Sequence, residues 1–329
     1  MIVLLSQQDY EHSTEDVLDW IAALGGHAVR LNGEDVNEDD PFVLECTADG
    51  VRGELSLGGV PVRTGEAAAV WLRRTHALHN VEFAAGVEPP SAGRMLRGYL
   101  LTELRATHRA LHAALAGTPW LTRPWQTDVD KLHTLTLAAR AGLEVPATIV
   151  TNDRARLAEF KARHGRVITK SVGNAVSFAL EDGRYPLYTA ELSDEDVAAA
   201  PERFFPSLVQ EMAEKAFEVR CFYLDGRCWS MAIFSQLDAQ TAVDFRRYND
   251  ERPNRTVPYL LPPEVESAVC SLMRSIPLDT GSLDLVCTPE GRHVFLEVNP
   301  VGQFGMVSAP CNYFLEREVA RSLISRASS

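Results

Sequence analysis

The stretch that decides the fold is SLDLV at 282–286, which is followed by a turn and then by FLEVNP at 295–300. Alternating apolar residues predict two neighbouring strands joined by that turn. Glu297 and Asn299 lie two residues apart, so they point to one face of their strand. Asp284 on the paired strand reaches the same face. The pattern therefore brings two carboxylates and one amide together.

A cation is needed to hold these carboxylates side by side. Two carboxylates about 4 Å apart repel each other by ~4 kcal/mol at an effective dielectric constant near 20. Oxygen-only ligands, two anionic and one amide, suit Mg²⁺, which keeps some of its waters and shares substrate phosphates. Leu296 and Val298 are expected to point into the core. The alternative is a solvated acidic sheet edge that ends in a turn at Asn299-Pro300.

Two lysines precede this segment and suit a polyphosphate. Lys170 closes the apolar strand at 167–169, and a buried lysine is rare without an anionic partner. Lys131 opens a helix before that strand. Each is equally compatible with a solvated end of a helix or strand.

The segment LVQEMA at 208–213 is an apolar strand whose end exposes backbone groups to an adenine edge. Glu218 follows shortly after it, and a carboxylate there accepts hydrogen bonds from ribose hydroxyls. The alternative is that Glu218 forms an ion pair with Arg220 across the face of a hairpin.

Hydrophobic periodicity predicts α/β and α+β architecture in three domains. Residues 1–118 form a parallel α/β domain, 119–190 a smaller α+β domain, and 191–329 a larger α+β domain dominated by antiparallel strands. A capping-box-like start at Ser13 begins the first helix. Strands are expected at 2–5, 27–31, 67–72, 147–150, 167–170, 218–223, 228–234, 282–287 and 293–298, and helices at 13–24, 92–116, 130–141, after 153, and at 263–275.

Composition excludes several classes of protein. The chain has 329 residues, 46% hydrophobic and 23% charged, with a formal net charge of −13. An acidic chain repels a phosphate backbone, so we expect no nucleic-acid partner. Six cysteines without a C-x-x-C pair indicate neither a disulfide framework nor a zinc site, and favour a reducing cytoplasm. No apolar run approaches ~20 residues, so no membrane span is expected.

Other catalytic motifs are absent. HGRVITKS at 164–171 ends like a Walker A loop, but His164 and Thr169 stand where both glycines are required. No G-x-G-x-x-G follows the first strand, and neither G-x-S-x-G nor H-E-x-x-H occurs. His108 and His112 lie four apart on a helix without a third ligand, which favours a surface or packing role.

Taken in order, these segments resemble the ATP-grasp superfamily of carboxylate–amine ligases over nearly the whole chain. Asp284, Glu297 and Asn299 match its Mg²⁺ pattern residue by residue. The resemblance implies an ATP-grasp fold with an N-terminal Rossmann-like pre-ATP-grasp domain, and ATP and Mg²⁺ as cofactors. It further implies that Lys131 and Lys170 contact ATP phosphates. The adenine hinge would be Gln210, Glu211, Met212 and Ala213, with Glu218 holding the ribose.

Within the superfamily, the chain is most similar to ATP-grasp peptide maturases of the grasp-with-spasm type, which are relatives of the graspetide (microviridin-like) synthetases. The blocks that carry this similarity are STEDVLDW at 13–20, RLNGED at 30–35, VWLRR at 70–74, FSQ at 234–236 and VDFRRYN at 243–249. One departure is the phosphate-covering segment 171–178, which contains only Gly173 where many superfamily members carry several glycines.

The resemblance implies a reaction on a ribosomally made precursor peptide. A substrate Asp or Glu side chain is phosphorylated by ATP, and a Ser/Thr hydroxyl or Lys amine of the same peptide attacks the acylphosphate to close an ω-ester or ω-amide macrocycle. Arg220 and Arg246 are candidates for gripping the phosphoryl group or the carboxylate. Asp244 is the candidate base. The Arg-, Asp- and Asn-rich region 234–262 is expected to contact the peptide, and homodimers are common among such proteins.

Two alternatives remain open at the level of sequence. One is an ATP-grasp ligase that adds free amino acids to a protein or small carboxylate, as ribosomal-protein glutamate ligases do. The other is a nucleotide-binding regulator without catalysis, which the intact metal triad argues against.

Overall fold

A computed structural model of the chain describes residues 1–7, 11–36, 41–57, 60–74, 89–173, 177–180, 183–186, 188–235 and 254–329. The chain forms two compact units. Unit 1 consists of Met1–Asp128 together with Phe314–Ser329, and unit 2 consists of Val129–Tyr313. Each unit thus has its own core.

Unit 1 is built on a three-stranded parallel sheet with the order β2-β1-β6. A separate antiparallel sheet has the order β3-β4-β5. Short 3₁₀ turns lie at Gly33–Asp35, Thr64–Glu66 and Pro124–Gln126. The elements are β1 (Ile2–Ser6), α1 (His12–Ala23), β2 (Ala28–Asn32), β3 (Phe42–Thr47), β4 (Gly50–Leu57), β5 (Val60–Arg63), β6 (Ala69–Leu72), α2 (Pro90–Ala114) and α8 (Leu315–Ala327).

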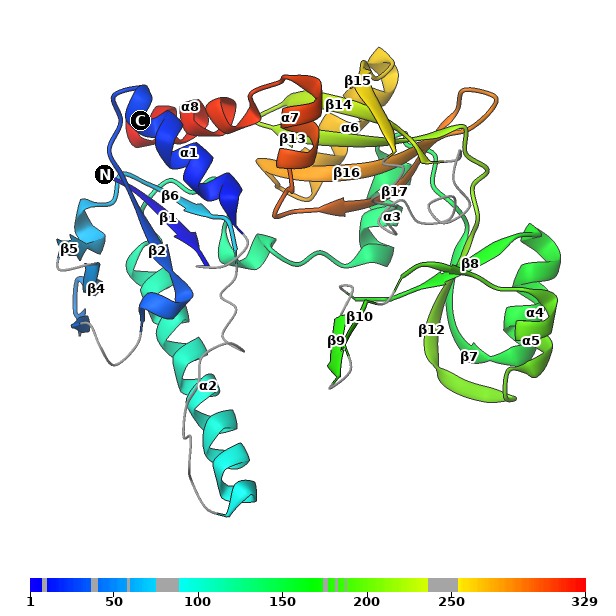
Figure 1. The fold of residues 1–329 in the computed structure, drawn as a ribbon, viewed down its shortest axis with the longest axis horizontal. Helices are drawn as coiled ribbons and strands as arrows, with labels where there is room; N and C mark the ends of the chain where they lie inside the picture. The colour runs from blue at the N-terminus through cyan, green and yellow to red at the C-terminus, as the bar shows by residue number, and fades with distance from the viewer. Residues whose placement is uncertain are drawn as a thin grey trace. The chain divides into compact units, whose positions relative to one another are not determined.

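The C-terminal helix α8 belongs to unit 1, where it packs against α1, β1 and β6 (Figure 1). Its apolar residues recur at helical spacing, and four of them are almost completely buried: Leu315, Val319, Ala320 and Leu323. The last helix, which is distant in sequence from the other elements of unit 1, therefore completes the core of that unit.

The start of α1 differs from the prediction. Glu11, and not Ser13, is the N-cap residue, and its side chain makes no capping hydrogen bond. The Ser13 hydroxyl donates to the Glu11 carboxylate, which also pairs with Arg73 at 2.9 Å and Arg74 at 2.6 Å. The expected capping box is wrong because a buried ion-pair network engages its serine.

Unit 2 contains a four-stranded sheet of order β11-β8-β12-β7, a five-stranded antiparallel sheet of order β15-β14-β13-β16-β17, and the hairpin β9–β10. Its elements are α3 (Lys131–Arg140), β7 (Thr148–Asp153), α4 (Arg154–His164), β8 (Val167–Lys170), β9 (Ser177–Leu180), β10 (Gly183–Pro186), β11 (Ala190–Glu191), α5 (Asp194–Ala199), β12 (Arg203–Glu211), β13 (Phe217–Leu224), β14 (Arg227–Phe234), β15 (Arg255–Tyr259), α6 (Pro263–Ser275), β16 (Thr280–Cys287), β17 (His293–Asn299) and α7 (Gly305–Cys311).

One face of the four-stranded sheet is covered by α4 and α5 (Figure 1). Val167 of β8 and Val209 of β12 point to this face, where they join Leu157 and Phe160 of α4 and Val197 of α5. Because side chains alternate along a strand, the residues next to these valines point to the opposite face.

The five-stranded sheet has an apolar face and a polar face. Helix α6 packs with Val269, Leu272 and Met273 against the apolar face, and α3 contributes Leu135 and Ala138. The hairpin β13–β14 turns at Asp225-Gly226, where both residues have positive φ angles of 48° and 86°, as a tight two-residue turn requires. The opposite face of this sheet carries the predicted site.

No helix of the described residues is long and apolar enough to cross a membrane.

Candidate active site

The predicted metal ligands lie on two adjacent strands of the five-stranded sheet, β16 and β17, and the predicted catalytic residue Arg220 lies on the next strand, β13. Arg220 of β13 pairs in register with Asp284 of β16, and Asp284 pairs with Glu297 of β17. Asn299 follows on β17, opposite Ser282. The sequence-predicted triad is thus assembled on one face.

A β-bulge aims Glu297 and Asn299 at this face. The register shifts after Asp284, since Asp284 pairs with Glu297 but Leu285 pairs with Phe295. The core cluster behind the sheet takes Phe295 and Val298, whereas Leu296 is half-buried and is not part of it. The expectation that Leu296 points into the core is therefore wrong. A bulge inserts one extra residue and re-aims the side chains that follow it.

Basic side chains balance the negative charges of Asp284 and Glu297. Arg220 Nη1 lies 2.5 Å from Asp284 Oδ2. Lys131 Nζ lies 3.7 Å and Lys170 Nζ 3.9 Å from Glu297 Oε2. The two lysines come from different elements, the start of α3 and the end of β8. Their convergence on Glu297 places the two predicted phosphate contacts beside the predicted metal ligand.

Local structure fixes the start of α3 and with it the position of Lys131. The side chain of Asp130 caps the helix by accepting a hydrogen bond from His133 N at 2.6 Å. Lys131 Nζ also donates to the Ser171 carbonyl at 3.1 Å, directly after the end of β8. The ammonium group is therefore held by two segments while its side chain stays 20% exposed.

The donor set suits Mg²⁺. Two carboxylates and one amide oxygen are hard oxygen ligands, and Asp284 and Glu297 keep 19% and 30% of their side-chain surface exposed. Asn299 Oδ1 accepts a hydrogen bond from Val301 N at 3.2 Å, which orients the amide. Within the described ranges, no cluster of three or more His, Cys, Asp or Glu side chains offers a competing metal site.

Glu218 does not pair with Arg220. Its carboxylate accepts hydrogen bonds from Lys215 at 2.5 Å and from Ser235 at 2.8 Å. Burial raises the pKa of Glu218, and the Lys215 ammonium opposes that shift. The alternative of a Glu218–Arg220 ion pair is wrong, because Arg220 is engaged by Asp284. The sequence analysis did not identify Lys215 and Ser235 as partners of Glu218. The three-residue spacing between Lys215 and Glu218 was a signal that could have indicated the first of them.

The predicted adenine hinge lies at the end of β12. Glu211 turns toward the α4 side, where its carboxylate accepts from Ala147 N at 3.2 Å and lies 3.8 Å from His164 Nδ1. Met212 N donates to the Arg166 carbonyl at 2.9 Å. Ala213 follows β12 in the connection to β13. Gln210 is 1% exposed and points to the face opposite α4.

Part of the predicted site lies outside the described residues. Asp244 and Arg246 belong to segment 236–253, as do most of the residues expected to contact a peptide. Arg255, at the start of β15, is described, and its guanidinium lies 5.3 Å from the centre of the Phe234 ring.

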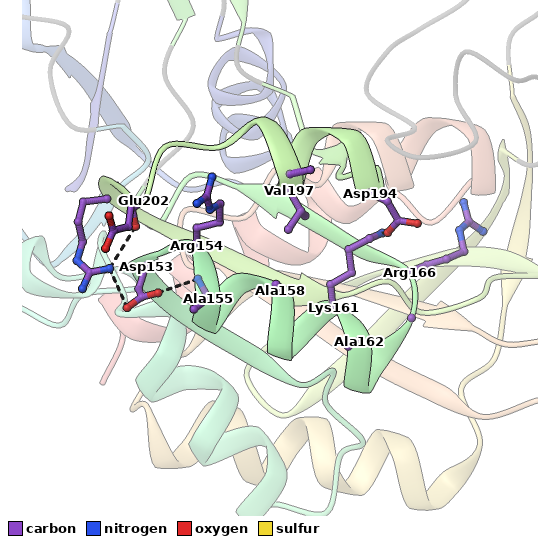
Figure 2. A pocket seen from close by; sticks show the side chains of 13 residues that line it. Asp153, Arg154, Ala155, Ala158, Lys161, Ala162, Arg166, Asp194, Val197 and Glu202 are labelled. Carbon is purple, nitrogen blue, oxygen red and sulfur yellow. Dashed lines mark hydrogen bonds and ion pairs between the residues drawn. The ribbon is translucent and has the colours of Figure 1, made fainter.

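Figure 2 shows a groove of about 1140 Å³ elsewhere in unit 2, along α4 and α5. Ion pairs border it, including Lys161–Asp194 at 3.3 Å and Arg203–Asp153 at 2.9 Å. None of the predicted site residues lines this groove. Sequence reasoning did not anticipate it, since its floor is formed by small residues such as Ala158 without a chemical motif.

No family model and no curated protein matches the chain. Among solved structures, macrocyclase MdnC from Microcystis aeruginosa, bound with precursor peptide MdnA, is 24% identical with a TM-score of 0.83, over 98% of this chain and 99% of that one. A RiPP-associated ATP-grasp ligase of Chryseobacterium gregarium, in complex with ADP and a leader and core peptide, is 19% identical with a TM-score of 0.86, over 99% and 96%.

The chain has the ATP-grasp fold. Macrocyclase MdnB from Microcystis aeruginosa supports the same conclusion, with 22% identity, a TM-score of 0.76 and 98% coverage of both chains. The likeness extends over almost the full length of each chain. The predicted resemblance in fold is therefore confirmed.

Proposed function

We propose that this ATP-grasp protein is an ATP- and Mg²⁺-dependent ligase that condenses side chains of a ribosomally made precursor peptide into ω-ester or ω-amide macrocycles. The observation that carries the proposal is the convergence of Lys131 and Lys170 on Glu297, in register with Asp284. Ammonium groups beside paired carboxylates fit a magnesium polyphosphate complex, and the metal, when bound, would offset charge on the transferred phosphoryl group.

The residues of the site have distinct roles in this reaction. Asp284, Glu297 and Asn299 hold the metal, while Lys131 and Lys170 orient the phosphates. Because a carboxylate is a poor electrophile at neutral pH, the substrate Asp or Glu is first converted to an acylphosphate. Gln210 to Ala213 receive adenine, and Glu218 receives the ribose hydroxyls, with the Lys215 ammonium opposing the rise that burial causes in the pKa of Glu218.

Arg220 is the best-supported catalytic residue of the described part of the chain. Asp284 holds one end of its guanidinium, and Nε is a buried donor without a hydrogen-bond partner among the described residues. A phosphoryl or carboxylate oxygen would satisfy that donor. Arg246 as a second anion-binding group and Asp244 as base for the acceptor remain proposals for segment 236–253.

The choice of a peptide substrate is supported by the similar structures. MdnC was solved with a precursor peptide, and the Chryseobacterium gregarium ligase with ADP and a leader and core peptide. The basic residues of region 234–262, of which Arg255 is described, are complementary to acidic side chains of such a peptide.

The finer architecture is part of the same proposal. The parallel sheet β2-β1-β6 supports a Rossmann-like pre-ATP-grasp domain at 1–118. Residues 119–190 would then form the central ATP-grasp subdomain and 191–329 the C-terminal one. We further propose a cytoplasmic enzyme, with a homodimer as its expected assembly.

The test is mass spectrometry of a candidate precursor peptide incubated with the protein, ATP and Mg²⁺. Loss of ~18 Da per ring is expected, and Glu297→Gln should abolish it because it removes one anionic ligand. The matched control is Glu290→Gln, which makes the same change at the exposed turn of the same hairpin.

Other outcomes would select an alternative. A gain of mass with added amino acids would indicate the free amino acid ligase. Tight ATP binding with an unchanged peptide, over a panel of acidic peptides encoded near the gene, would favour the regulator.

A further inference from the structure

Three cysteines from different elements meet on the apolar face of the five-stranded sheet. Cys221 of β13 belongs to the core cluster that α6 covers, and Cys228 of β14 and Cys270 of α6 pack against that cluster. Cys228 pairs in register with Tyr223, two residues along β13 from Cys221, so both cysteines point to the same face. All three are free thiols. They lie on the side of the sheet opposite the candidate active site.

The Cys228 thiol lies between the other two. It shares one hydrogen bond with Cys221 and another with Cys270. The Cys270 thiol also donates to the Gly226 carbonyl, with 3.6 Å between sulfur and oxygen. This contact ties α6 to the turn of the hairpin β13–β14, two residues before Cys228. The sulfur atoms are thus already neighbours, as disulfide formation requires.

Geometry and exposure select one pair of the three. Cys221 and Cys228 are diagonal neighbours on antiparallel strands, and such residues lie about 7–8 Å apart, whereas the Cα atoms of disulfide-bonded cysteines lie about 4.4–6.8 Å apart. Cys221 is also fully buried, with 0% of its surface exposed. Cys228 and Cys270 are both half-buried, so a small oxidant in solution reaches them. Because Cys270 comes from a helix, the pleat of the sheet does not fix its distance from Cys228.

The surroundings decide which thiol reacts first. Burial raises the pKa of Cys270, but the hydrogen bond from Cys228 opposes that rise. Hydrogen bonding to Cys221 is the main cause that raises the pKa of Cys228, and burial adds to it. Because the thiolate is the nucleophile, Cys270 is the better first nucleophile and Cys228 is the partner that follows. Both thiols react slowly at neutral pH, so a strong oxidant is required.

We propose that Cys228 and Cys270 form a reversible disulfide between β14 and α6 when the protein meets a peroxide. The Cys270 sulfur attacks one oxygen of hydrogen peroxide, the O–O bond breaks, and a sulfenic acid and one water form. The Cys228 sulfur then attacks the sulfenic sulfur, the S–O bond breaks, and a second water leaves with the thiol proton. The two sulfurs lose two electrons in total, and peroxide is reduced to two waters. This inference is independent of the proposed ligase function.

The bond would close residues 228–270 into one covalent ring. The region 234–262, which the sequence predicts to contact a peptide, lies wholly inside this ring. A two-electron oxidation on one face of the sheet would therefore restrain both ends of that region.

Tryptic mapping separates the three thiols, because cleavage after the arginines of the chain places them in the peptides 221–227, 228–246 and 256–274. The full chain carrying Cys46→Ser, which removes an exposed cysteine, is treated with hydrogen peroxide, alkylated and digested without reductant. Most of the cross-linked material should join 228–246 to 256–274, with a mass ~2 Da below the sum of the two peptides. Dithiothreitol should return both peptides.

Variants identify the order of the two steps. In Cys228→Ser, Cys270 should be labelled by dimedone, a reagent for sulfenic acids, because the sulfenic acid has no partner thiol. In Cys270→Ser, the yield of cross-link should fall at least about ten-fold, and Cys228 should remain open to alkylation. The matched control is Cys311→Ser, which changes a buried cysteine of α7 outside the cluster and should leave the cross-link unchanged.

Several results would overturn the inference. A dominant link between 221–227 and 228–246 would do so, as would oxidation of Cys270 to sulfinic acid without any link while Cys228 is present. A link between two copies, revealed by mixing isotope-labelled and unlabelled chains, would also contradict it. The map of the chain with both thiols intact decides the pairing, so misfolding of a serine variant does not rescue the inference. Failure to cyclise any peptide would contradict only the ligase function.

Discussion

Ion pairs hold the candidate site together before any ligand enters. Asp284 is paired with Arg220, and Glu297 lies between two lysines. Like charges on neighbouring strands would otherwise repel each other. In the proposed function the same groups would serve a bound nucleotide, because a metal would balance the charge of the carboxylates while phosphates would pair with the lysines.

A half-buried histidine gives unit 1 a specific pH dependence. Burial lowers the pKa of His112 from 6.5 to about 4, and its ring packs edge-on against Trp120 at 5.9 Å. Below pH 6.5 the unfolded chain binds a proton at this site that the folded chain does not, so stability should decrease as pH falls from 6.5 to about 4. The loss attributable to His112 is up to about 3 kcal/mol.

The measurement is urea unfolding followed at several pH values across that window. His112→Gln does not titrate and should show a shallower decline than the wild type. Parallel curves for the two proteins would mean that His112 is not the group responsible.

Much of the candidate site could be predicted from the types and spacing of its residues. Two-residue spacing placed Glu297 and Asn299 on one face, and the surface or packing role predicted for His108 and His112 agrees with the burial of His108 and the packing of His112 against Trp120. The partners of Glu218 and Arg220 could not be predicted. They depend on which strands lie side by side, and β16 lies far from β13 in sequence.

The bulge at Leu296 is the element that aligns the site. Without the extra residue, Glu297 would share the face of Phe295 and enter the core. A local pattern encodes only regular alternation. It predicted the strand and its polar face, but it wrongly placed Leu296 in the core, where Phe295 lies instead. The sheet β3-β4-β5 was also not predicted. It depends on contacts between residues apart in sequence, such as Gly53 N of β4 donating to Thr64 Oγ1 in the 3₁₀ turn after β5 at 2.8 Å.

The turn after β17 allows a direct test of backbone constraint near the site. Gly302 has φ +64°, and an added Cβ would lie 3.3 Å from Phe222 Cε2 and 3.4 Å from Gly281 Cα. Gly302→Ala should therefore destabilise the protein by about 2 kcal/mol. Gly305→Ala is the control, since its Cβ would meet nothing within 4 Å and no positive φ is involved. Chemical denaturation of both variants checks the prediction, and equal stabilities would contradict it.

At the scale of the whole molecule, the chain passes between units at 128–129 and returns at 313–314. Local sequence patterns predicted many of the strands and helices, and the predicted bounds of α3, β8 and α6 lie within one residue of the observed bounds. The position of α8 in the fold was not predicted. Helical spacing of its leucines and valine indicates a helix, but nothing local indicates that it packs on α1.

Removal of α8 should therefore damage unit 1 selectively. Each fully buried Leu or Val side chain contributes about 1.5–3 kcal/mol, so loss of Leu315, Val319 and Leu323 approaches the whole stability of an ordinary domain. A chain ending at Tyr313 should lose hydrogen-exchange protection in β1 and β6 while β13 and β16 keep theirs. A chain ending at Ala327 is the control. Full protection of β1 in the shorter chain would refute the prediction.

The position of α8 in unit 1 also determines when this unit can finish folding during protein synthesis. A ribosome adds roughly 5–20 residues per second, so the sheet of unit 1 emerges some ten seconds or more before α8 exists. Throughout that interval the surfaces of α1 and β6 that α8 will cover remain open to chaperones and proteases. The amino-terminal unit, although translated first, therefore reaches its native state only after α8 has been made.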